Sequence, residues 1–221
     1  MIQVIPAINE KDFSEIEKKL KLIEPYTNWA QLDVADSTFT QNTIWHNPKD
    51  LRDLQTNLNI EVHLMINDIE NRVEEWLVPQ VKRIIFHIET AKDPDLVIEK
   101  IKKAGKEPGI AVGPDGKWTD LAHYKGKVNF FQILGVRPGL PGQQIDENVY
   151  ENIKQLKKFC ESSLTDRQAC IIEVDGGVNV DNAKRLIEAG ADILCAANAI
   201  FSTQGGGDIK NNIEALKNVF R

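Results

Sequence analysis

Short apolar segments rich in β-branched residues alternate with longer amphipathic segments along the chain, and this rhythm limits the possible folds more than any other feature. The strand-like segments are residues 2–8, 29–34, 62–66, 83–88, 108–112, 128–134, 169–174 and 193–197. The helix-like segments are residues 13–23, 49–58, 71–77, 94–103, 118–123, 147–160, 181–189 and 209–220. Strands separated by helices run parallel, and eight such units can close into a barrel. The sequence therefore predicts an α/β fold, a (β/α)8 TIM barrel with a parallel eight-stranded sheet, as one domain over residues 1–221.

The charge and hydropathy of the chain argue against two classes of partner. The formal net charge of -6 opposes broad attraction to nucleic acid, because binding to the phosphate backbone depends on clustered Lys and Arg. No apolar run approaches the roughly 18 residues that a membrane-spanning helix needs, so we expect no membrane partner. The first residues, Met-Ile-Gln-Val-Ile-Pro, include no basic leader, so we expect a cytoplasmic protein.

The cysteines show no recognisable pairing pattern. Cys160, Cys170 and Cys195 are odd in number and include no C-x-x-C spacing, which argues against both a disulfide framework and a zinc ribbon. We therefore expect three reduced and mostly buried thiols.

Polar residues stand near the ends of several predicted strands. Active sites of such barrels lie at the carboxyl ends of the strands, where Asp33, His63 and Asp175 would converge from three different strands. A single aspartate at a strand end is usually a turn former or a helix cap, but two carboxylates and an imidazole on one rim can hold a divalent metal ion. His87 and Glu89 share one face near the end of a fourth strand and are weaker candidates, because an isolated strand histidine is more often a core residue.

Glycine-rich loops after the last three predicted strands are candidates for binding a phosphate group. Glycine lets backbone amides approach a ligand, and helix amino termini favour anions. Barrels often bind phosphate after strands seven and eight, although such glycines can also serve only to make tight turns. The residues predicted to contact substrate or phosphate are Ala7, Met65, Gly139, Gly142, Gln143, Gly176, Gly177, Ala197 and Asn198.

Five segments, taken in order, resemble the motifs of the ribulose-phosphate 3-epimerase family. They are Gln-Leu-Asp-Val-Ala-Asp-Ser-Thr-Phe-Thr-Gln-Asn (31–42), Val-His-Leu-Met (62–65), Phe-His-Ile-Glu (86–89), Arg-Pro-Gly-Leu-Pro-Gly-Gln (137–143) and Glu-Val-Asp-Gly-Gly-Val-Asn (173–179). The chain departs from the family pattern at several positions: Ala7 for Ser, Asn9 for Leu, Gln31 for His, Ala35 for Met, Pro141 for Gly, and Ala197-Asn198 for Gly-Ser.

The resemblance implies an isomerase of the pentose phosphate pathway, with a small phosphorylated ketose as its substrate. In this family the aspartates that match Asp33 and Asp175 are the acid and base for proton transfer at C3 between ribulose 5-phosphate and xylulose 5-phosphate. They share a divalent metal ion, here zinc, iron or manganese, with the histidine that matches His63. Gln31 stands where a second histidine is expected, and its amide oxygen is a weaker candidate ligand. We also expect a homo-oligomer, although the sequence does not give the number of subunits.

Three alternatives remain at this point. A related ketohexose-phosphate 3-epimerase would use the extra room that Ala35 leaves in place of Met. A decarboxylase or aldolase-like synthase of the same fold is disfavoured, because Ala35 occupies the lysine position of the Asp-x-Lys-x-x-Asp pattern that those enzymes show. A non-catalytic sugar-phosphate binder is favoured by Gln31 and Ala7, but the presence of both aspartates opposes it.

Overall fold

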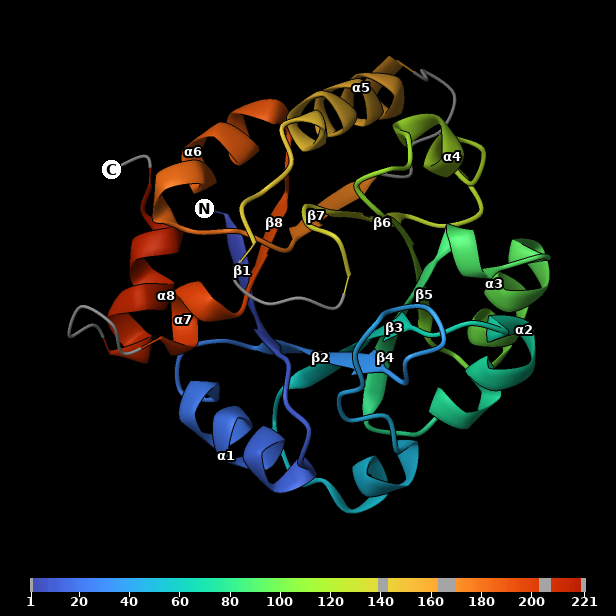
Figure 1. The fold of residues 1–221 in the computed structure, drawn as a ribbon, viewed down its shortest axis with the longest axis vertical. Coiled ribbons are helices and arrows are strands. Elements are labelled where there is room, and N and C mark those ends of the chain that lie inside the picture. Colours follow the sequence, from blue (N-terminus) through green and yellow to red (C-terminus); the bar gives the residue numbers. More distant parts are fainter. Residues whose placement is uncertain (1, 139–142, 163–169, 203–207, 220–221) are drawn as a thin grey trace.

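The computed structural model describes residues 2–138, 143–162, 170–202 and 208–219, and its eight strands form one closed parallel barrel (Figure 1). Each strand pairs with its neighbours in sequence, and β8 returns to pair with β1. This confirms the predicted (β/α)8 fold. The strands are β1 Gln3–Ile8, β2 Trp29–Ala35, β3 Asn59–Met65, β4 Val81–His87, β5 Glu107–Val112, β6 Phe130–Leu134, β7 Ile171–Asp175 and β8 Ile193–Ala196.

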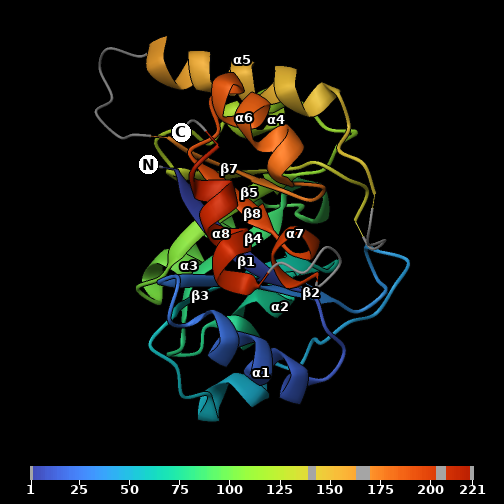
Figure 2. The ribbon, with the colours of Figure 1, turned by 90° about the vertical axis from the view of Figure 1, so that its left-hand side faces the viewer.

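The helices surround the barrel, and the side view shows the strands between α5 and α1 (Figure 2). The α-helices are α1 Phe13–Ile23, α2 Ile69–Arg72, α3 Pro94–Lys103, α4 Trp118–Ala122, α5 Asn148–Ser162, α6 Val180–Ala189, α7 Asn198–Phe201 and α8 Ile209–Lys217. The 3-10 helices are η1 Pro48–Asp53, η2 Val73–Trp76 and η3 Ile88–Thr90. No helix in the described part of the chain is both long and apolar enough to cross a membrane.

The segment 49–58 departs from the prediction of one helix. The structure has the short helix η1, which ends where Leu54 becomes extended. Beyond it, the Glu24 carboxylate accepts hydrogen bonds from the Thr56 hydroxyl and from the Asn57 amide. These two polar groups therefore bond to a side chain distant in sequence, whereas in a continued helix the Asn57 amide would donate to a backbone carbonyl of the preceding turn.

Two separate apolar layers stabilise the fold. The larger one lies between the strands and the helices, where α1 contributes Ile16, Leu20 and Ile23. A smaller one fills part of the barrel interior with Ile5, Ala7, Ile85, Ala111, Phe130, Ile193 and Cys195. Because successive side chains of a strand point to opposite faces, one strand can contribute to both layers, as β1 does with Val4 in the larger layer and Ile5 in the smaller one. The barrel is thus a packed core with a rim and not an open channel.

The prediction of three reduced thiols is wrong for two of the cysteines. Cys160, near the end of α5, and Cys170, just before β7, form a disulfide with their Cα atoms 5.9 Å apart. Such a separation suits a disulfide, but it is set by how α5 and β7 pack, so the spacing in sequence gave no sign of it. Cys195 is free and buried, as predicted.

Candidate active site

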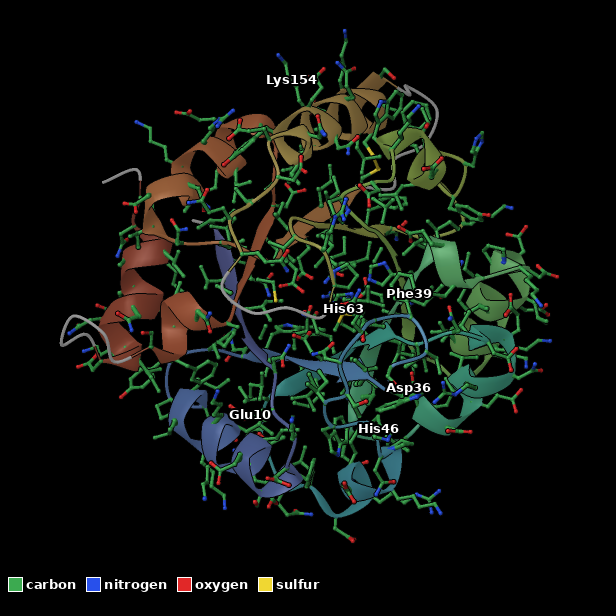
Figure 3. All side chains as sticks on the ribbon, in the orientation of Figure 1. Glu10, Asp36, Phe39, His46, His63 and Lys154 are labelled. Carbon is green, nitrogen blue, oxygen red and sulfur yellow. A yellow bond between two sulfur atoms is a disulfide. The ribbon has the colours of Figure 1, made fainter. Side chains whose placement is uncertain are left out.

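Three strands bring Asp33, His63 and Asp175 together at the rim of the barrel. Asp33 pairs in register with His63 across β2 and β3, and Asp175 is the last residue of β7. One ligand atom from each side chain lies within 4.8 Å of the other two, and all three residues are buried. Figure 3 shows His63 inside the ring of strands with Phe39 nearby, whereas Lys154 projects outward from α5. The barrel geometry therefore assembles the predicted set of three.

The Nδ1 atom of His63 faces both carboxylates. It lies 3.2 Å from Asp175 Oδ2 and 3.5 Å from Asp33 Oδ1, yet it makes no hydrogen bond of acceptable geometry to any described residue. Burial disfavours a charged imidazole, but the two carboxylates outweigh it and raise the pKa of His63 to about 9. Burial also raises the pKa of Asp33, and the charge of Asp175 adds to this, while contacts with His63 and Gln31 oppose it.

Gln31 connects the two aspartates through its amide nitrogen. Its Nε2 donates to Asp33 Oδ1 and to Asp175 Oδ2, each at 2.8 Å. Its oxygen accepts from Gln132 Nε2 at 2.9 Å, and the same Gln132 nitrogen donates to Glu173 Oε1 at 2.9 Å. The predicted role of the Gln31 oxygen as a fourth metal ligand does not fit this arrangement, because that oxygen points toward Gln132 and the nitrogen faces the carboxylates.

A buried charged layer lies one step below the rim. Glu61 Oε2 accepts from Arg83 Nη1 at 2.5 Å, and the Arg83 guanidinium lies 3.7 Å from the centre of the Phe130 ring. Burial raises the pKa of Glu61 to about 7, although Arg83 opposes this. Burial and the neighbouring Glu61 raise the pKa of Glu173 well above its ordinary value. The site predicted from the sequence did not include Glu61, Arg83 or Gln132. The period-two pattern of the strands was the signal that would have placed all three inside the barrel.

His87 and Glu89 extend the site on the side away from Gln31. His87 Nε2 lies 2.9 Å from His63 Nε2, and His87 Nδ1 lies 3.3 Å from Glu89 Oε2. Burial lowers the pKa of His87. Burial disfavours an ionised Glu89, but its contacts with His87 and its hydrogen bond from the Gly113 amide outweigh this and lower its pKa. His87 therefore belongs to the site, where the sequence had made it a weaker candidate.

An apolar cluster follows Asp33 on β2. Ala35, Ile44 and Met65 form a small buried cluster, and the side chain of Phe39 packs against it. Ala35 is fully buried, so the room expected from the missing methionine side chain is not open at this position. This removes the argument that favoured a larger ketohexose-phosphate substrate.

The predicted phosphate-binding residues occupy several loops. Gly176 and Gly177 follow β7 with φ angles of 84° and 73°, a left-handed conformation that favours glycine. A Cβ added at Gly177 would lie 3.0 Å from the Ile145 amide nitrogen, so a side chain there would disturb the fold as well as any ligand contact. Ala197 precedes α7, and Asn198 is the first residue of that helix.

The other residues predicted to contact the substrate or its phosphate lie in different surroundings. Ala7 is buried on β1, beside Gln31 in the register of β1 and β2. Gln143 Nε2 donates to the Arg137 carbonyl oxygen at 2.7 Å. Gly139 and Gly142 lie outside the described residues.

Known proteins with the same fold include a synthase and a decarboxylase. The structure of 3-hexulose-6-phosphate synthase matches all of this chain and all of its own with a TM-score of 0.71 at 12% identity. Orotidine 5'-phosphate decarboxylase from Pyrococcus horikoshii matches 98% of each chain with a TM-score of 0.65 at 14% identity. At such low identity these likenesses support the fold alone.

Comparison of sequences is more specific. A ribulose-phosphate 3-epimerase of Methanocaldococcus jannaschii is 31% identical, over 98% of this chain and 90% of its own. The chloroplastic ribulose-5-phosphate-3-epimerase of Arabidopsis thaliana is 30% identical, over 98% of this chain and 77% of its own. The profile of the ribulose-phosphate 3 epimerase family matches residues 3–201. The chain, with its paired strand-end aspartates on a closed (β/α)8 barrel, therefore belongs to the ribulose-phosphate 3-epimerase family.

Proposed function

We propose that this protein interconverts D-ribulose 5-phosphate and D-xylulose 5-phosphate by proton transfer at C3. The observation that carries the proposal is the placement of two buried carboxylates, Asp33 and Asp175, on strands β2 and β7 around one imidazole. Removal of a proton next to a ketone needs a positioned base, and inversion needs a proton donor on the other face. Two carboxylates on different strands supply both.

The two oxygens of each carboxylate differ in their hydrogen-bond partners. Asp33 Oδ1 and Asp175 Oδ2 accept from Gln31, and Asp33 Oδ2 accepts only a long hydrogen bond from Asn9 Nδ2 at 3.4 Å. Asp33 Oδ2 and Asp175 Oδ1 are therefore the oxygens proposed to face the substrate. One of these oxygens takes the C3 proton, and the other carboxylate delivers a proton to the opposite face. The raised pKa of Asp33, caused mainly by burial, favours a carboxyl group that can hold a proton between the two steps. The loops that include Gly176, Gly177 and Asn198 are proposed to bind the phosphate.

Asp33, His63 and Asp175 fit a divalent cation as three ligands. Two donors on a tetrahedral ion with bonds of about 2.0–2.1 Å lie about 3.3–3.4 Å apart. The distances from His63 Nδ1 to Asp175 Oδ2 and Asp33 Oδ1 are 3.2 and 3.5 Å. The Nδ1 atom is also buried and without a hydrogen-bond partner among described residues, as a ligand atom would be. When bound, the ion would act as a Lewis acid toward the C2 carbonyl.

Isotope exchange tests the proposed activity directly. The purified protein is incubated with D-ribulose 5-phosphate in deuterated water, and the products are analysed by NMR. We expect deuterium at C3 together with D-xylulose 5-phosphate. A parallel incubation with a ketohexose phosphate tests the alternative substrate. Deuterium in that sugar and none in the pentulose phosphates would replace the proposed substrate, and binding without any exchange would support a non-catalytic binder instead.

The affinity for a divalent ion should rise with pH. Because the carboxylates hold the pKa of His63 at about 9, the metal-free protein keeps a proton there at neutral pH, and a metal must displace it. The apparent affinity for Mn²⁺ should therefore increase about tenfold per pH unit between about pH 6 and 8 and level off above the pKa. Calorimetry in buffers of different ionisation enthalpy should detect about one proton released. A flat affinity with no proton release would contradict the role of His63 as ligand.

Replacing Gln31 by His should strengthen the metal site. An imidazole nitrogen at this position is a better ligand than an amide that donates to the carboxylates, so Gln31→His should bind Zn²⁺ on the order of tenfold more tightly. Metal content after dialysis against a mild chelator is measured for both proteins. Gln3→His, which adds a histidine at an exposed position on β1, is the matched control and should behave as the parent. Equal metal loss from all three proteins would argue against a metal at this rim.

A further inference from the structure

A line of hydrogen-bonding groups runs from the rim of the barrel toward the loop after β5. The Gly113 amide donates to Glu89 Oε1 at 2.6 Å, and Glu89 Oε2 lies 3.3 Å from His87 Nδ1. His87 Nε2 then lies 2.9 Å from His63 Nε2, with the two rings nearly parallel at 24°. The line ends at His63 Nδ1, which faces Asp33 and Asp175. The catalytic steps proposed above do not use its outer members.

Each contact in this line determines the direction of the next. A carboxylate only accepts hydrogen bonds, so the hydrogen of a neutral His87 must lie on Nδ1, facing Glu89. His87 Nε2 is then an acceptor, and the short contact requires the hydrogen of His63 to lie on Nε2. In the metal-free protein a proton on His63 Nδ1 faces the two carboxylate oxygens. When that proton leaves, the hydrogen on Nε2 stays in place, and Nδ1 offers a lone pair to a cation bound between it and the carboxylates.

The surroundings hold the line in place. His87 is completely buried, the Phe39 ring packs against it at 4.9 Å between centroids, and Thr90 Oγ1 donates to the His87 carbonyl oxygen. A Cβ added at Gly113 would lie 3.0 Å from Glu89 Oε1, so the missing side chain gives the carboxylate room to reach the amide. The orientation of Glu89 is therefore set by the backbone of β5 and its loop.

We propose that Glu89 and His87 are positioning residues that present the unprotonated Nδ1 of His63 to a divalent cation. The proposal rests on the metal site of the proposed function and assigns it a hydrogen-bonded support on β4 and the residues that follow. Outer partners of this kind fix the tautomer and the ring orientation of a metal-binding histidine, and their loss commonly costs about 10- to 100-fold in metal affinity. Neither residue needs to touch the substrate.

Glu89→Gln is a sharp test because it reverses two hydrogen bonds, the one between residue 89 and His87 and the one between His87 and His63. The Gly113 amide still requires an acceptor, so the new carboxamide turns its oxygen to Gly113 and its NH2 group to His87. His87 must then carry its hydrogen on Nε2, and His63 must accept there and carry its own hydrogen on Nδ1. The variant keeps the size of the side chain but directs a hydrogen, in place of a lone pair, at the metal position.

Two measurements follow the reversal. Nitrogen-15 NMR of the metal-free proteins should show His87 with its hydrogen on Nδ1 in the parent and on Nε2 in Glu89→Gln. The affinities for Zn²⁺ and Mn²⁺ should fall about 10- to 100-fold in the variant. Glu75→Gln makes the same chemical change at an exposed position and should alter neither result. The chain has four histidines, so the spectrum of His87→Phe identifies the His87 signals.

His87→Phe also tests the proposal in a second way. It keeps an aromatic ring beside Phe39 but removes the acceptor for His63 Nε2, so metal affinity should fall while thermal unfolding shows a folded protein. The same His87 tautomer in the parent and in Glu89→Gln would overturn the proposal, and so would metal affinities within threefold of the parent in both variants. If the parent binds neither ion, the metal of the proposed function is wrong, and the His87 tautomer alone then decides whether Glu89 sets the direction of the hydrogen bonds that reach His63.

Discussion

Asp175→Asn is expected to reduce epimerase turnover by about 100- to 10,000-fold, the usual cost of losing a general acid or base. The new side chain has nearly the same shape, and its amide oxygen can still accept from Gln31, so the rim should keep its geometry. It can neither take nor deliver the C3 proton, and it is a poorer ligand beside His63. Turnover is measured with D-ribulose 5-phosphate, and binding of D-xylulose 5-phosphate is measured by calorimetry.

The comparison with a neighbouring aspartate separates chemistry from folding. Asp181 is exposed in the first turn of α6, so Asp181→Asn should leave turnover unchanged. Asp175→Asn should bind the sugar phosphate while turning it over slowly. Turnover of Asp175→Asn within tenfold of the parent would remove Asp175 from the mechanism.

Arg83→Met is expected to lower the free energy of unfolding by about 3–5 kcal/mol, as for other buried ion pairs that lose one partner. The guanidinium side chain is only 6% exposed and pairs with Glu61, whose side chain is completely buried. Arg83 also pairs with Glu107 and lies against the Phe130 ring. Its loss leaves Glu61 without its charged partner inside the barrel.

The loss should depend on pH in a defined direction. Burial already raises the pKa of Glu61 to about 7, and without Arg83 it should rise further. When the pKa of a carboxyl group is higher in the folded state than in the unfolded state, the protein loses stability as the pH rises from the unfolded-state pKa through the folded-state pKa. Arg83→Met should therefore be destabilised more at pH 8 than at pH 5. Urea unfolding at both values measures this.

Arg185 provides a matched control for Arg83. It also pairs with a glutamate, Glu147, and lies 3.7 Å from the centre of an aromatic ring, Tyr150, but its side chain is 56% exposed. Exposed pairs contribute about 0–1 kcal/mol, so Arg185→Met should cost little. Similar losses for Arg83→Met and Arg185→Met would show that burial of the charge is not the cause.

Much of the fold could be predicted because its signals are local. Alternation of apolar residues at periods of two and 3.6 distinguishes strand from helix, and parallel strands of a barrel must end on the same rim. The convergence of Asp33, His63 and Asp175 follows from those two facts. Their catalytic roles, the phosphate-binding loops, the single domain, the homo-oligomer and the cytoplasmic location remain predictions.

What only the tertiary structure decided are contacts between residues far apart in sequence. The direction of the Gln31 amide depends on Gln132, which lies 101 residues away, and the pairing of Cys160 with Cys170 depends on how α5 meets β7. A strand pattern places a side chain inside the barrel, but its partner there is determined by the register and twist of strands on the other side. The sequence by itself therefore determined which side chains reach the rim, and the closed barrel decided which atom of Gln31 faces the two aspartates.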